Sequence, residues 1–128
     1  MADYVIEKTV EGTFEETVAR VKEALQGEGM GVLSEILVNV KLKEKLGVDI
    51  APYVILGACH PPSAFQAIEA EPAIGVLMPC NVVVQSVEGG TAVRAVRPTQ
   101  SLGITGREDL GHLGADVEAR LRRVVESL

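Results

Sequence analysis

The chain has 128 residues, of which 47% are apolar and 23% are charged, and its formal net charge at pH 7 is −6. This length suits a single domain over residues 1–128, which can bury enough surface to fold without a disulfide or a metal. The acidic balance argues against nucleic acid and anionic membranes as partners, because both require clustered lysine and arginine.

The N-terminal segment MADYVIEKTVEG has neither the basic region nor the apolar region of a signal peptide. No apolar run approaches the roughly 20 residues that a membrane-spanning helix needs. We therefore expect a cytoplasmic protein that does not insert into a membrane. In that compartment two cysteines are expected to stay as thiols unless they take part in chemistry.

The spacing of apolar residues predicts nine elements. In chain order they are a strand over 3–10, a helix over 14–26, a strand over 30–38, a short helix over 40–46, a strand over 52–60, a helix over 62–71, strands over 81–87 and 91–97, and a helix over 107–127. The last helix carries a continuous apolar stripe at Leu110, Leu113, Val117, Leu121, Val124 and Leu128.

Several ends of these elements carry typical residues. Thr13 and Glu16 match a capping box, and Asn39 is expected to cap the short helix that stops at Gly47. Two β-branched runs flank Gly89-Gly90, which predicts a hairpin with its tight turn at these glycines. The apolar run 72–84 is interpreted as a buried strand, and residues 98–106 as a loop.

The order β-α-β-α-β-α-β-β-α favours an α+β fold, in which helices pack on one face of a mainly antiparallel sheet. A parallel α/β sheet is the alternative. The choice matters for Cys59 and Cys80. If the strands over 52–60 and 81–87 are antiparallel neighbours, both cysteines lie at the same end of the sheet. If these strands are parallel, the cysteines lie at opposite ends.

Residues 42–84 resemble the uncharacterised single-domain family called domain of unknown function 302. The segments that carry the resemblance are KEKLG, YVILGACHP, AFQAIEAEP and IGVLMPCN. The resemblance implies an α+β fold of the TATA-binding-protein-like topology in a single copy, and it implies no activity and no catalytic residues. Many members have Asn where this chain has His60, which argues against a Cys-His catalytic pair shared by the family.

The two cysteines and their neighbours form the main candidate site. Cys59 precedes a proline-led helix, whose positive N-terminal end would stabilise a thiolate. The alternative is that Cys59 packs as a small apolar side chain and that burial raises its pKa. We predict a small-molecule pocket whose residues are Cys59, His60, Cys80 and Asn81, with Glu35 and Lys43 at the rim and Glu71 nearby.

A metal site is not expected, because the cysteines and histidines lack CxxC or HxxxH spacing. His60 on its own is interpreted as a surface or loop residue, and His112 is expected to be exposed. If Glu35 faces inward it needs a cationic partner, for which Lys43 or Lys45 is the natural candidate. The alternative for Glu35 and Glu71 is an ordinary exposed carboxylate.

Three functions stay open on the sequence. The first is binding of a small molecule in a cavity of a few hundred Å³. The second is a homodimeric assembly or interaction module without catalysis, which the mean hydropathy of +0.23 favours. The third is a thiol-based enzyme or redox sensor. The sequence identifies no catalytic residue and no cofactor.

Overall fold

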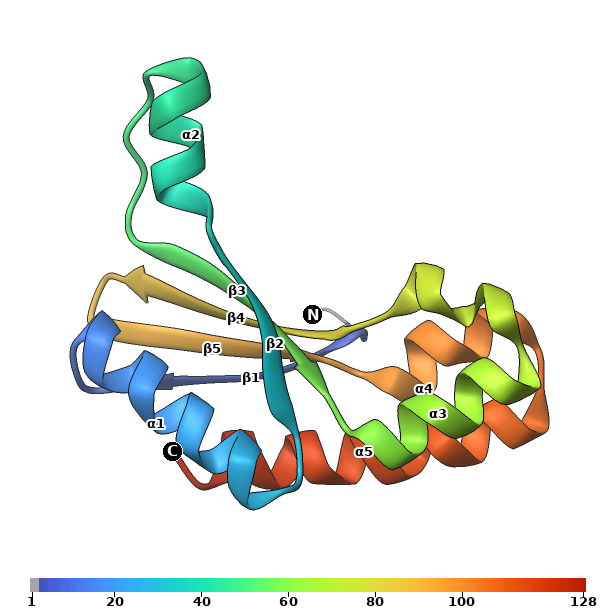
Figure 1. Cartoon of the computed structure of the whole chain (residues 1–128). Helices are drawn as coiled ribbons and strands as arrows, with labels where there is room; N and C mark the ends of the chain where they lie inside the picture. Colours follow the sequence, from blue (N-terminus) through green and yellow to red (C-terminus); the bar gives the residue numbers. More distant parts are fainter. Residues whose placement is uncertain (1–2) are drawn as a thin grey trace.

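The structure is a computed structural model that describes residues 3–128, and it contains five strands in one sheet (Figure 1). The elements in chain order are β1 Val5–Val10, α1 Phe14–Gly27, β2 Gly31–Leu37, α2 Val38–Leu46, β3 Tyr53–Cys59, α3 Pro61–Ala70, η1 Pro72–Leu77, β4 Cys80–Val87, β5 Gly90–Val96, α4 Pro98–Ser101, η2 Leu102–Thr105 and α5 Glu108–Glu126. The segments η1 and η2 are 3₁₀-helices.

The strand order in the sheet is β1-β5-β4-β3-β2, and every neighbouring pair is antiparallel. The predicted α+β class is therefore confirmed, and the parallel alternative is wrong. Figure 1 shows α1 and α5 together on one side of the sheet. The helix α3 extends beyond the sheet at one end, and α2 stands away from it at the other.

One face of the sheet carries the core, because alternate strand residues point toward α1 and α5. The buried side chains on this face are Val54, Leu56, Val82, Val84 and Val93 from the strands and Val21, Leu25, Leu121 and Val124 from the helices. Full burial of one such aliphatic side chain contributes roughly 1.5–3 kcal/mol. This layer therefore holds the two long helices against the sheet.

The opposite face of the sheet is open. A row of facing residues crosses it at Ile36, Ile55, Val83, Arg94 and Glu7. Within residues 3–128 no helix lies over this row, and Ile36 keeps 46% of its surface exposed. We call this surface the open face.

Four local predictions need correction. The short helix begins at Val38, one residue before Asn39, so Asn39 does not cap it; its Oδ1 accepts a hydrogen bond from the Tyr53 backbone N–H at 3.2 Å instead. The hairpin turn is Glu88-Gly89, because Val87 already faces Gly90 in the ladder. Residues 72–77 are a 3₁₀-helix rather than strand, and much of 98–106 is helical rather than loop.

The observed helix ends agree more closely with the ends predicted from the sequence. The Thr13 hydroxyl accepts a hydrogen bond from the Glu16 backbone N–H at 3.1 Å, as the capping box predicts. The prolines at 61–62 occupy the first turn of α3, and Glu71 is its C-cap residue. Predicted and observed ends of α5 differ by one residue on each side.

Candidate functional site

The two cysteines lie at the same end of the sheet, where β3 ends and β4 begins. Because β3 and β4 are antiparallel, Ala58 faces Cys80, and Cys59 is the residue after Ala58. Gly57 leaves room for the chain that enters β4: a Cβ built on it would be 2.7 Å from Pro79 Cγ. The strand ends therefore bring together LGACHPP and LMPCN, two segments separated by α3 and η1.

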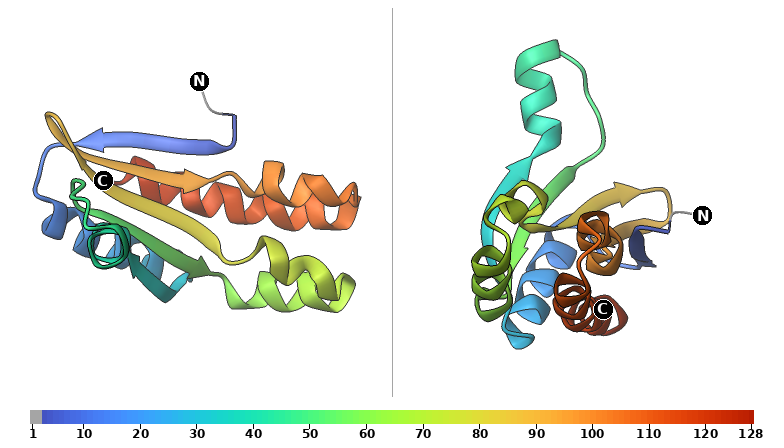
Figure 2. Two further views of the ribbon diagram at one scale, coloured as in Figure 1. Left: turned by 90° about the horizontal axis from the view of Figure 1, so that it is seen from above. Right: turned by 90° about the vertical axis from the view of Figure 1, so that its right-hand side faces the viewer.

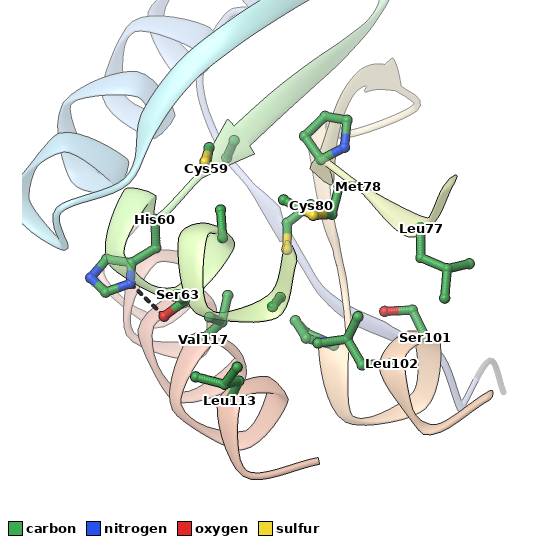
Figure 3. A pocket seen from close by; sticks show the side chains of 15 residues that line it. Cys59, His60, Ser63, Leu77, Met78, Cys80, Ser101, Leu102, Leu113 and Val117 are labelled. Atoms are coloured by element: carbon green, nitrogen blue, oxygen red, sulfur yellow. Dashed lines mark hydrogen bonds between the residues drawn. The ribbon is translucent and has the colours of Figure 1, made fainter. Parts of the chain in front are cut away.

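A small pocket lies beyond these strand ends (Figure 3). Its walls come from α3, η1, the region of α4 and η2, and α5, and its free volume is about 50 Å³. The residues around it include Cys59, His60, Met78, Cys80, Leu102 and Leu113. The volume is smaller than the few hundred Å³ expected, because Met78, Leu77 and Leu102 pack into the space as part of a second apolar cluster.

Both thiols are free, and both are kept protonated by their surroundings. Burial raises the pKa of Cys59. Burial, and to a smaller extent the neighbouring Cys59, raise the pKa of Cys80 to about 11. The net shift in pKa of both thiols is upward, because burial dominates, and this agrees with the interpretation of Cys59 as a packed apolar side chain.

We expect Cys80 to resist alkylation in the folded protein. With a pKa of about 11, only about one Cys80 in 10⁴ is a thiolate at pH 7, against a few per cent for an ordinary cysteine. Labelling with N-ethylmaleimide, followed by mass spectrometry of Cys59→Ser and Cys80→Ser variants, measures each thiol separately. Cys80 should react at least about 100-fold more slowly than free cysteine. A Cys80 rate near that of free cysteine would contradict the assignment.

His60 is held by a neighbour that the sequence reading did not single out. Its Nδ1 lies 2.7 Å from the Oγ of Ser63, which is buried in the first turn of α3 (Figure 3). Burial first, and then the positive charge of Arg120, lower the pKa of His60, while Asp116 acts in the opposite direction. The pair gives the apolar pocket one polar corner, formed by a neutral imidazole and a hydroxyl.

Two of the other predicted site residues lie elsewhere on the sheet. Asn81 faces Gly57 and is exposed, and it does not line the pocket. Glu35 lies on the edge strand β2 and pairs with Lys22 of α1 at 2.9 Å, so its cationic partner is neither Lys43 nor Lys45. Both side chains of this pair are 40% exposed, which fits an ordinary surface ion pair.

Lys43 and Glu71 are also outside the pocket lining. Lys43 lies on α2, at the far end of the molecule, and its Nζ contacts Asp49 at 3.1 Å. Glu71 caps the C-terminus of α3, where its carbonyl accepts a hydrogen bond from the Ile74 backbone N–H. The structure therefore brings together Cys59, His60 and Cys80, and it separates them from the other four residues.

Sequence reasoning missed the other residues that line the pocket, several of which are far from the cysteines along the chain. They include Ser63 and Ala64 on α3, Leu77 and Met78 before β4, Pro98, Ser101 and Leu102 after β5, and Leu113 and Val117 on α5. Of these residues, only Ser63 could have been found from the local sequence. It lies three residues after His60, which is the spacing between the N-cap residue of a helix and its N3 position, whose side chains often contact each other.

A buried carboxylate fastens two of the pocket walls to each other. Glu118 of α5 accepts hydrogen bonds from the Thr99 backbone N–H at 3.0 Å and from Arg97 Nε at 3.3 Å. The Thr99 hydroxyl donates a further bond to the same carboxylate. Because Glu118 is only 8% exposed, these bonds hold α4 in place beside α5.

Residues 3–128 contain no group of three or more His, Cys, Asp or Glu side chains placed to hold a metal ion. Among the helices of the same described part, none is long and apolar enough to cross a membrane. His112 is exposed, as expected.

Comparison with known proteins identifies a family. The sequence model described as "Domain of unknown function DUF302" matches residues 6–128. A crystal structure of an uncharacterized conserved protein DUF302 from Bacillus stearothermophilus is similar, with a TM-score of 0.90, 33% sequence identity, and 98% of each chain covered. Among curated proteins no match was found.

Proposed function

Because the chain belongs to the family Domain of unknown function DUF302, whose description states no activity, we propose a function from its own residues: it binds a small, largely apolar molecule at the ends of β3 and β4. The pocket in which Cys59, His60 and Cys80 meet is the observation that carries this proposal. Its walls are mostly aliphatic, and the His60–Ser63 pair offers one hydrogen-bonding corner. This combination is typical of ligand sites in proteins.

The volume restricts the ligand. A cavity needs roughly 10–15 Å³ of such free volume to hold one water molecule, so a space of about 50 Å³ admits only a few heavy atoms. A neutral ligand, or the apolar end of a longer molecule, suits walls whose two thiols stay protonated. An anion would find no charged partner among the residues that line the pocket.

Xenon provides a direct test, because it enters small apolar cavities without needing a hydrogen bond. We expect xenon to shift the backbone amide resonances around Ala64 and Cys80 in NMR spectra of the full chain. The variant Ala64→Leu adds an isopropyl group, three carbon atoms, at a residue that lines the pocket and should weaken this effect about tenfold. The matched variant Ala119→Leu adds the same atoms to an exposed position on α5 and should leave it unchanged. Equal responses in the wild type and the Ala64→Leu variant would rule the pocket out.

Self-assembly is the second candidate function. Seven large apolar side chains with at least 41% exposure lie between residues 33 and 50, at Leu33, Ile36, Leu37, Val40, Leu46, Val48 and Ile50. Such a local concentration of exposed apolar groups supports an interface role. A homodimer is the commonest outcome for a chain of this kind.

The third candidate, thiol chemistry, is disfavoured by the raised pKa of Cys59 and Cys80. The cytoplasmic location also stays a proposal, supported by the thiols of Cys59 and Cys80, which are not joined in a disulfide.

A further inference from the structure

A projecting segment at one end of the molecule lacks a covering partner. We call residues 38–50, which are α2 and the loop after it, the arm. Figure 1 shows the arm standing away from the sheet, and none of the nine described residues of α2 is buried. Isolated helices of this length are marginal in water. The arm nevertheless exposes 70% of Leu46, 44% of Val48 and 42% of Ile50.

The open face lies on the same side of the sheet as the arm. The right-hand view of Figure 2 looks along the strands, and there the arm and the sheet form the two limbs of an L. The arm connects the edge strand β2 to its neighbour β3, and β1 is the strand at the opposite edge of the sheet. The inner surface of the L includes Ile36, Ile55 and Val83, which the arm of the same chain does not cover.

The charges of the two limbs differ in sign. The arm carries three lysines, one glutamate and Asp49, a net charge of +1, which leaves −7 on the rest of a chain whose total is −6. The far edge of the open face carries two carboxylates: Glu7, which pairs with Arg94 of the same row at 3.1 Å, and the exposed Glu11, which follows β1 and has no ion pair with a described residue. Lys45 forms no ion pair with any described residue.

We propose that a second copy of this chain covers both surfaces, in a twofold dimer in which two open faces pack together. A twofold axis parallel to the strands puts the arm of each copy against the β1 edge of the other. The lysines of the arm then meet Glu7 and Glu11 of the partner, and the apolar side chains of the arm are removed from water. Such an interface is self-complementary, as a closed dimer requires. This inference rests on self-assembly, the second candidate function above.

Analytical ultracentrifugation of the full chain at micromolar concentration tests the inference. We expect a species of twice the 13.6 kDa chain mass. The variant Leu46→Glu places a charge at the exposed tip of α2 and should weaken dimerisation by roughly 30-fold, with an unchanged circular dichroism spectrum. The matched variant Val76→Glu changes an even more exposed residue, on η1 at the opposite end of the molecule, and should leave the dimer intact.

A charge exchange tests which edge the arm contacts. Lys45→Glu should weaken the dimer, and combining it with Glu7→Lys and Glu11→Lys should restore affinity. A monomeric wild type would overturn both self-assembly and this inference. A dimer that persists in the Leu46→Glu variant, or that Val76→Glu disrupts, would overturn the interface but leave self-assembly standing. Failure of the charge exchange to restore affinity would overturn the contact between the arm and the β1 edge.

Discussion

Replacing Gly90 with alanine is expected to destabilise the protein by about 3 kcal/mol. Gly90 begins β5 at φ +157°, a backbone conformation that side-chain-bearing residues rarely adopt. A Cβ built on it would also collide with the backbone carbonyl oxygen of Val10, at the end of β1. Because that obstacle is backbone, a side-chain rotation cannot remove it. The hairpin and the edge strand would both have to shift.

Thermal unfolding followed by circular dichroism measures the effect. A loss of this size should lower Tm by roughly 10 °C in a domain of this length. Gly111→Ala is the matched control, since Gly111 lies on α5 with open space where a Cβ would be. That change should leave stability unchanged or raise it by up to about 1 kcal/mol. A Gly90→Ala variant as stable as the wild type would show that β1 can move away at little cost.

Replacing Glu118 with glutamine is expected to cost about 2 kcal/mol of folding free energy. The carboxylate accepts bonds from Thr99 and Arg97, and Arg122 lies 3.5 Å from its Oε2. Glutamine keeps the shape but loses the charge: its amide oxygen can still accept the bonds from Thr99, whereas its NH₂ group cannot accept the bond that Arg97 donates to Oε2. Since Pro98, Ser101 and Leu102, which are close to Thr99 in the chain, form one wall of the pocket, the variant should also weaken the xenon response.

This contribution depends on pH in a defined direction. Burial alone would raise the pKa of Glu118, but the bonds from Thr99 and the charge of Arg97 outweigh it and lower the pKa below the ordinary value of 4.5. The unfolded chain therefore takes up a proton at Glu118 before the folded protein does. The stabilisation is complete above about pH 5.5, and it is lost as the pH falls below 4.5 and through the folded pKa.

Urea denaturation of the wild type and the Glu118→Gln variant at several pH values checks both statements. The difference in unfolding free energy should be constant at neutral pH and should shrink at low pH. Glu108→Gln is a suitable control, because Glu108 is an exposed residue in the first turn of α5. A difference that stays constant down to pH 3 would mean that the charge of Glu118 is not what stabilises α4.

Much of the fold could be predicted because its signals are local. The cap at Thr13, the prolines at 61–62 and the alternation in β3 and β4 each act within a few residues, so the sequence shows them directly. The wrong predictions concern segments whose conformation depends on contacts with residues far away in the sequence. Asn39 satisfies the conditions for a cap, yet its side chain accepts a bond from Tyr53. The helical turns at 98–106 pack on α5, where Pro98 closely approaches Gly114.

The candidate site shows the same division. From the sequence alone one could predict that Cys59 lies at the end of a strand, that a proline-led helix follows it and that Cys80 lies at the start of the next strand. That the two strands are antiparallel, which places both thiols at the same end of the sheet, became clear only from the folded chain. The tertiary structure also decided the partner of Glu35, the remoteness of Lys43 and the small size of the pocket. Hydrophobic periodicity specifies which residues of an element face the core, whereas strand order and contacts between distant elements depend on how all the apolar faces pack together.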